Sequence, residues 1–235
     1  MHWFIKKPVP LEPEKMAGFG VRRPEGLSFA TEIEVVPIGF SEVIPCSLWY
    51  PVFFGLSERE PLILVALGAG KKSLFLNPDN SWKISVVPRV LQIYPFGIIK
   101  SGEEEYTIVV EEEYLVEGEG EPLFTEEGET VYFQNIKAQI EEVAQDLHEA
   151  SRKAREIIEL GLVQRLELYH RFSFGEIYLK NGLTADVRKL SRLQPEKIYH
   201  LVVKGVLPAL LAQNLSIRNF ALFELFHRFE GRLPF

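Results

Sequence analysis

Apolar positions follow two different periods in the two halves of the chain. In the first half they form short runs or alternate with polar positions, as in Phe29–Pro37 and Pro61–Leu67, which is typical of strands. In the second half they recur mostly at helical spacing. The pattern predicts an α+β fold with an antiparallel β-rich part over residues 27–130 and a mainly helical part over residues 131–235, the helices covering one face of the sheet.

The helical half begins with a heptad pattern. Steps of four and three residues alternate through Ile136, Ile140, Val143, Leu147, Ala150, Ala154 and Ile157. This spacing predicts one long helix over residues 132–160 that ends at Gly161, with Glu149 and Lys153 as an i, i+4 pair on its outer side. The seam packs either on the chain's own sheet and C-terminal helices or on a second copy. In the second case the contacts of a homodimer are Ile136, Ile140, Val143, Leu147 and Ala154.

Turn residues punctuate the predicted strands. Phe96–Ile99 and Tyr106–Val110 predict a hairpin around Ser101-Gly102. Leu166–Phe172 and Phe174–Lys180 predict two further strands, and the Asn-Gly pair at residues 181–182 predicts a turn after them.

The C-terminal region is unusually apolar. A helix is expected to start at Pro195 and to stop near Gly205, followed by a helical region from Pro208 to Phe229. Apolar residues cover nearly the whole circumference of that last region. Such a helix is buried by its neighbours or by a partner.

Four prolines dominate the N-terminal segment, at positions 8, 10, 13 and 24. Each fixes φ and removes a hydrogen-bond donor, so residues 1–26 are expected to form an extended arm. Residues 27–235 are then expected to form a single domain, which a chain of 235 residues is long enough to support.

Composition and charge exclude several classes of protein. Hydrophobic residues make up 46% and charged residues 25%, which is ordinary for a folded chain. Residues 101–130 contain 12 Glu and no basic residue, and the net charge is −7. A nucleic-acid-binding protein usually shows a basic face, so we expect no nucleic-acid partner. Abundant Glu and Lys with sparse Met, Cys and Gln favour a thermophilic source.

The single cysteine, Cys46, permits no intrachain disulfide, which favours a reducing compartment and a cytoplasmic location. The first residues lack the apolar core of a signal peptide. The most apolar window, Val206–Phe226, contains Pro208, Gln213, Asn214, Arg218, Asn219 and Glu224. Ionisable residues are costly at a membrane centre, so we expect no membrane-spanning helix.

Familiar catalytic motifs do not fit the sequence. Gly68–Ser73 resembles a phosphate-binding loop, but Val65 stands where the first Gly is required and an apolar strand follows instead of a helix. The five histidines show no metal-binding spacing, and there is no nucleophile elbow. Cys46 lies among apolar residues and is interpreted as a core residue instead of a nucleophile. We therefore expect no metal, no cofactor and no identifiable catalytic residue.

Trp82, Arg89 and Tyr94 are the best candidates for binding a ligand. A Trp and a Tyr near one Arg can form a stacking platform. The alternative is that they anchor a corner of the core.

Several short motifs occur in a recognisable order. They are Val36-Pro-Ile38 with Glu42, Tyr50-Pro-Val-Phe-Phe54, Ser73–Trp82, Val87-Pro88, Tyr94-Pro-Phe96, Gly120–Gly128 and Asn214-Leu-Ser-Ile-Arg-Asn219. By these motifs the chain resembles the SapC family of bacterial proteins over about residues 27–230. Two departures stand out: Asn80 or Ser81 replaces the family's Gly before Trp82, and Gln92-Ile93 replaces a basic pair. Asn is the least costly replacement where φ is positive.

The resemblance implies no catalytic residues, and only the family's name implies a role in surface-layer or envelope biogenesis. The first hypothesis is a non-enzymatic binding or accessory protein that acts through a protein or peptide partner. The second is a small-molecule-binding enzyme with scattered active-site residues, and the third is a self-assembling homodimer.

Overall fold

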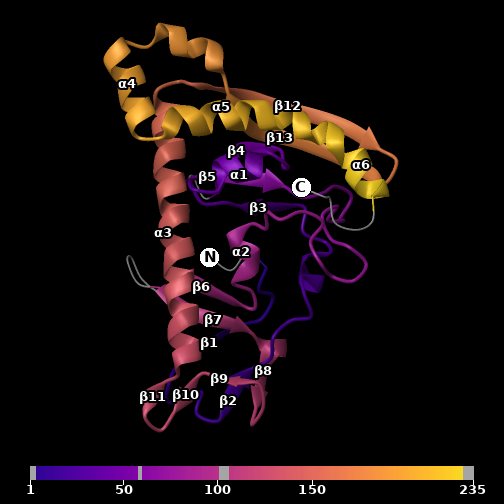
Figure 1. Ribbon diagram of the computed structural model, residues 1–235, viewed down its shortest axis with the longest axis vertical. Coiled ribbons are helices and arrows are strands. Elements are labelled where there is room, and N and C mark those ends of the chain that lie inside the picture. Colours follow the sequence, from indigo (N-terminus) through magenta and orange to yellow (C-terminus); the bar gives the residue numbers. More distant parts are fainter. Residues whose placement is uncertain (1–3, 58–59, 101–105, 230–235) are drawn as a thin grey trace. The chain divides into compact units, whose positions relative to one another are not determined.

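The computed structural model describes residues 4–57, 60–100 and 106–229, and it confirms the α+β class. The chain divides into two compact units (Figure 1). The first unit comprises residues 1–29 and 89–145, and the second comprises residues 30–88 and 146–235. The predicted arm over residues 1–26 and single domain over residues 27–235 stay predictions.

The first unit contains a three-stranded antiparallel sheet in the order β1-β7-β6. Its strands are β1 (Pro8–Pro10), β7 (Tyr106–Glu111) and β6 (Phe96–Lys100). The predicted pairing of the last two is confirmed, whereas the turn at Ser101-Gly102 lies outside the described residues. The proline-rich β1 is an edge strand, where a residue without N–H is tolerated. The buried carboxylate of Glu111 accepts hydrogen bonds from the backbone N–H groups of Lys6 (2.6 Å) and Lys7 (2.9 Å).

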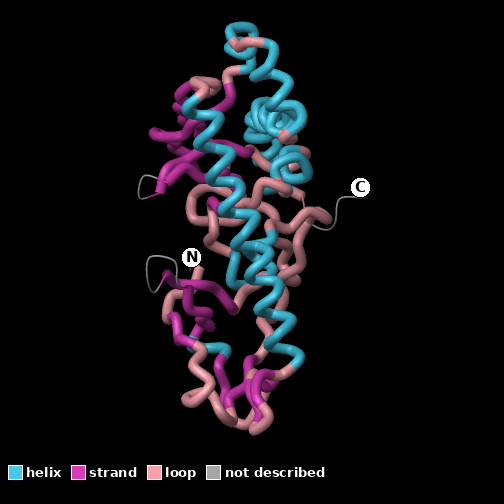
Figure 2. Tube along the Cα trace, turned by 90° about the vertical axis from the view of Figure 1, so that its left-hand side faces the viewer, coloured by secondary structure: helices cyan, strands magenta, loops and turns pink. Residues whose placement is uncertain are grey.

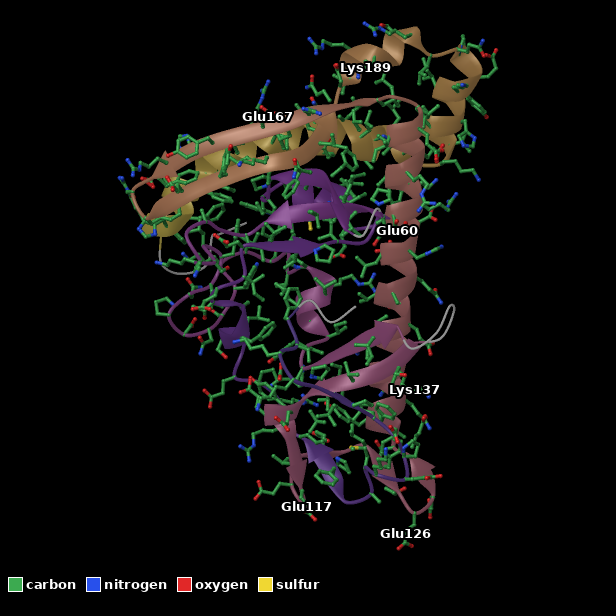
Figure 3. All side chains as sticks on the ribbon, turned by 180° about the vertical axis from the view of Figure 1, so that it is seen from behind. Glu60, Glu117, Glu126, Lys137, Glu167 and Lys189 are labelled. Carbon is green, nitrogen blue, oxygen red and sulfur yellow. The ribbon has the colours of Figure 1, made fainter. Side chains whose placement is uncertain are left out.

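Two smaller sheets complete this unit. β2 (Phe19–Val21) pairs with β8 (Leu115–Glu117) and β9 (Glu121–Pro122), and β10 (Phe124–Thr125) pairs with β11 (Gly128–Glu129). The acidic span therefore forms strands with the proline-rich arm, so the arm is part of the unit's core. Within the acidic span, Leu123 and Phe124 are buried, as predicted. Its Glu117 and Glu126 point away from the strands (Figure 3).

The heptad pattern forms α3 (Val131–Glu159), and residues of this helix belong to both units. The Thr130 hydroxyl accepts a hydrogen bond from Phe133 N at 3.2 Å, which caps its first turn. Gly161, with φ of 69°, follows its end, as predicted. The prediction that Lys153 lies on the outer side is wrong. Its side chain is buried, with Nζ 3.7 Å from Glu149 and 5.7 Å from the Phe40 ring centroid. The short α2 (Arg89–Gln92) and η2 (Glu112–Tyr114) are further helical segments of the first unit.

The second unit is built on a five-stranded antiparallel sheet in the order β12-β13-β4-β5-β3. The strands are β3 (Val35–Pro37), β4 (Val52–Ser57), β5 (Glu60–Ala66), β12 (Val163–Phe172) and β13 (Gly175–Ala185). The prediction of a turn at Asn181-Gly182 is wrong, because β13 continues through it. Glu167 of β12 lies opposite both Lys180 and Asn181 where the register shifts, so Asn181 belongs to a β-bulge and Gly182 is the paired residue that follows it.

Helices of the C-terminal part lie on one side of these strands (Figure 2). They are η3 (Val187–Arg192), α4 (Pro195–Val203), α5 (Val206–Ser216), η4 (Ile217–Leu222) and α6 (Phe223–Arg228). The short α1 (Val43–Ser47) packs beside α5, and η1 (Ser28–Ala30) precedes the first strand of the sheet. Pro195 starts α4, as predicted, and Gly205 with φ of 69° separates α4 from α5.

One face of α5 joins the central strand β4 of this sheet to its neighbour β13. β13 and β4 form a single backbone pair, Leu183↔Phe54. Beside it, the buried amide of Gln213 accepts from Ala185 N at 2.8 Å and donates to Val52 O at 2.7 Å. The Ser216 hydroxyl accepts from Val52 N at 2.9 Å, and Asn214 donates to Ala185 O at 2.7 Å. Side chains of α5 thus satisfy backbone groups that a longer strand pairing would have satisfied.

The substitution Gln213→Leu tests this connection. Leu keeps the apolar volume but leaves Ala185 N–H without its side-chain acceptor and Val52 C=O with only the longer bond from the Ser216 hydroxyl at 3.4 Å. We expect the free energy of unfolding to fall by about 2–4 kcal/mol, because each buried unsatisfied group costs about 1–3 kcal/mol. Urea unfolding would measure the change. Gln145→Leu, at an exposed position of α3, is the control and should stay within about 0.5 kcal/mol. A loss for Gln213→Leu as small as that of the control would contradict the bridging role.

Candidate functional site

A cavity of about 470 Å³ lies within the first unit. Three segments line it: residues 23–29 of the N-terminal arm, the corner between α2 and β6 at residues 91–96, and the start of α3 at residues 132–139. All three belong to the same unit, so its packing positions the cavity walls.

Aromatic side chains form the walls. The rings of Phe29 and Tyr94 stack with centroids 3.8 Å apart, and Tyr114 meets the Tyr94 ring edge-on at 5.4 Å. Phe96 and Tyr132 lie 6.4 Å apart in a tilted arrangement. Tyr94 and Phe96 are buried, so the walls continue into the core of the unit.

Polar side chains surround the opening. Asn135 and Gln139 line the cavity from α3 and are exposed. They share a helix face with Tyr132, because residues three, four and seven positions apart lie above one another. The guanidinium of Arg23 lies 5.8 Å from the Tyr132 ring centroid and 3.6 Å from Glu121. The cavity therefore combines apolar walls with amide groups and one partly neutralised cation.

The two tyrosines that line the cavity, Tyr94 and Tyr132, both have a raised pKa. Burial, together with Tyr114, Glu111 and Glu113, raises the pKa of Tyr94 well above its ordinary range. Burial also raises the pKa of Tyr132, although Arg23 opposes that shift. At neutral pH both phenols are hydrogen-bonding groups that carry no charge.

The three predicted ligand-binding residues divide between the units. Tyr94 lines the cavity. Arg89 is half-buried in the first unit, and its guanidinium pairs with Glu142 at 2.7 Å. Trp82 is buried in the second unit, where its indole N–H donates to Tyr50 Oη at 2.7 Å. Its ring also stacks near Phe75, so Trp82 anchors a core.

Sequence reasoning missed Arg23, Tyr132, Asn135 and Gln139. The sequence did contain a signal for three of these cavity residues, because Tyr132, Asn135 and Gln139 flank the first seam position, Ile136, on the predicted helix. Only the fold shows that this polar edge faces residues 91–96.

The seam residues are covered by their own chain. Ile140, Val143, Leu147 and Ala154 are at most 4% exposed, and Ile136 lines the cavity. These side chains leave little surface for a second copy. The homodimer stays a prediction.

A second concave region of about 840 Å³ opens in the second unit where β13 and β4 diverge. Phe53, Gly55 and Leu64 contribute apolar surface, and Arg165, Glu167 and Lys180 contribute charge. The Lys180 ammonium lies 4.7 Å from the Tyr178 ring centroid. Its charged groups partly offset one another, which distinguishes it from the aromatic cavity.

No group of three His, Cys, Asp or Glu side chains within the described ranges could hold a metal ion. In the same part of the chain no single helix is both long and apolar enough to cross a membrane. Two helical segments, Pro195–Val203 and Val206–Arg228, are long and apolar enough only when they are taken together, and their axes are bent by 85°.

Comparison with known proteins identifies a family. The sequence model of the SapC family matches residues 11–222. Neither the curated proteins nor the solved structures contain a match to this chain.

Cys46 provides a test of reactivity. Its thiol is fully buried in α1, and burial together with Glu42 raises its pKa far above the ordinary value. Because the thiolate is the nucleophile, we expect no alkylation by iodoacetamide at pH 8 in the folded protein and complete alkylation in urea. Mass spectrometry would measure both. Rapid modification of the folded chain would contradict the assignment of Cys46 to the core.

Proposed function

The chain belongs to the SapC family, and we propose that it is a non-enzymatic binding protein whose first-unit cavity receives an apolar or aromatic side chain of an extended peptide. The observation that carries this proposal is the combination of aromatic walls and an amide rim. The volume of the cavity, about 470 Å³, falls within the usual range of ligand pockets.

Each part of the cavity complements a part of a peptide. Contact between an apolar side chain of the peptide and Phe29, Tyr94 and Phe96 removes apolar surface from water, which stabilises the complex. The amides of Asn135 and Gln139 can donate to and accept from peptide groups of the ligand's backbone. An extended peptide presents both kinds of group at once.

The low charge of the cavity lining favours an uncharged ligand group. Among the described residues that line the cavity, Arg23 alone has an ionised side chain, and Glu121 lies near its guanidinium. A strongly acidic or basic side chain would lose its hydration without gaining a full partner. The ligand is therefore proposed to place an uncharged side chain in the cavity.

The lining also bears on the alternative of a small-molecule enzyme. The described residues of the lining include no Ser, Thr, Cys, His, Asp or Glu. With the pKa of Tyr94 and the pKa of Tyr132 both raised, neither phenol is suited to act as a base at neutral pH. These features support binding over catalysis. The surface-layer or envelope role that the family's name implies would provide one source of such a peptide.

Blocked pentapeptides Gly-Gly-X-Gly-Gly provide a direct test. In amide NMR spectra we expect X = Phe or Leu to shift the side-chain amide signals of Asn135 and Gln139, and X = Asp or Lys to leave them in place. The double variant Asn135→Ala, Gln139→Ala should weaken binding about 10- to 100-fold, because it removes two or more hydrogen bonds.

Asn181→Ala is the matched control, since Asn181 is an exposed amide on β13 in the second unit. It should bind like the unaltered protein. Equal shifts for every X, or unchanged affinity in the double variant, would refute the peptide cavity. Conversion of the peptide to a product would favour an enzyme.

A further inference from the structure

The outer surface of α4 and α5 exposes large apolar side chains. Tyr199, Val202 and Val203 of α4 are 71%, 50% and 62% exposed, and Leu211 and Leu215 of α5 are 42% and 60% exposed. Leu48, which directly follows α1, is 68% exposed, and α1 and α4 both pack against α5. These residues are called the α4–α5 surface below.

The exposed apolar residues of α5 lie opposite a face of the same helix that is already buried. Val206, Leu210 and Gln213 lie seven residues or fewer apart and are buried toward the sheet and α1. Leu211 and Leu215 lie on the other side, and no charged residue occurs between Gly205 and Ile217. Apolar patches of this kind mark interaction sites on soluble chains.

The charge of the same region opposes that of the whole protein. From Val187 to Leu222 the chain has six Lys and Arg residues and a single acidic residue, Glu196, although its net charge is −7. Lys197, Lys204 and Arg218 are exposed and form no ion pair with another described residue.

Three other basic groups of this region already have partners. Arg188 Nε lies 2.8 Å from Asp186, and His200 lies 3.3 Å from Glu156. Lys189, on the short helix that precedes α4 (Figure 3), donates to Val163 O at 2.7 Å. The basic character of the region thus rests on Lys197, Lys204 and Arg218, together with the exposed Arg192 three residues before α4.

We propose that the α4–α5 surface binds an anionic phospholipid bilayer by lying in its interface. Apolar side chains of such a surface enter the boundary of the acyl chains, while long basic side chains reach the phosphate groups. The two segments, Pro195–Val203 and Val206–Arg228, meet at 85°, and each exposes large apolar side chains. This binding uses the second unit and does not depend on the peptide cavity.

A second copy of the chain is a weaker candidate for the partner. In a two-fold symmetric contact the same patch meets itself, so Lys197, Lys204 and Arg218 would approach the same residues of the other copy. Like charges at an interface disfavour association. Anionic lipid supplies the opposite charge.

Vesicle flotation tests the proposal with the full chain. We expect binding to phosphatidylcholine vesicles that contain about 30% phosphatidylglycerol, little binding to pure phosphatidylcholine, and weaker binding as salt rises from about 0.1 M to 1 M. Lys197→Gln with Lys204→Gln should weaken binding about 30-fold. Leu211→Ser with Leu215→Ser should weaken it about 10-fold.

Two matched double variants separate this surface from general charge and apolarity. Arg171→Gln with Lys180→Gln removes exposed bases on the β12–β13 hairpin, and Leu56→Ser with Val131→Ser removes exposed apolar side chains elsewhere. Both should bind vesicles like the unaltered protein, and circular dichroism checks that all variants fold. No binding to anionic vesicles, equal losses in the controls, or a dimer that Leu211→Ser with Leu215→Ser dissociates would overturn the proposal.

Discussion

The sheet of the second unit depends on hydrogen bonds from α5 side chains at its centre. A single backbone pair links β13 to β4, and Gln213, Asn214 and Ser216 satisfy the neighbouring groups of Val52 and Ala185. Buried backbone groups without partners are costly, so the hairpin, the sheet and the helix hold their positions together. The outward direction of Leu211 and Leu215 follows from the inward direction of Gln213.

The stretches by which the chain resembles its family have structural explanations here. Trp82 donates to Tyr50, whose hydroxyl donates to Val86 O, and the two rings pack on Phe75. Asn80 occupies φ of 62°, where the family's Gly would be relaxed, and Asn is the least costly replacement. Asn219 donates to the carbonyls of Ser47 and Tyr50. In this chain, these stretches hold loops and strand ends in place.

The two proposed binding surfaces have a different origin. The first-unit cavity forms between three segments that are far apart in the sequence, and none of its lining residues belongs to a catalytic motif. The α4–α5 surface arises because the described part of the chain covers only one side of an apolar helix. Hydrophobic periodicity predicted that this helix needs cover, but periodicity does not reveal which side the fold leaves open.

The sequence by itself determined the local elements: the long helix from its heptad pattern, the start of α4 from Pro195, the β6–β7 pairing, and a core position for Cys46. These follow from spacing and backbone preference, which are local properties. Only the tertiary structure decided that Trp82 and Tyr94 belong to different units, that Lys153 is buried, and that β13 continues through Asn181-Gly182. Each of those outcomes depends on residues distant in the chain, whose contacts outweigh a local preference of about 1 kcal/mol.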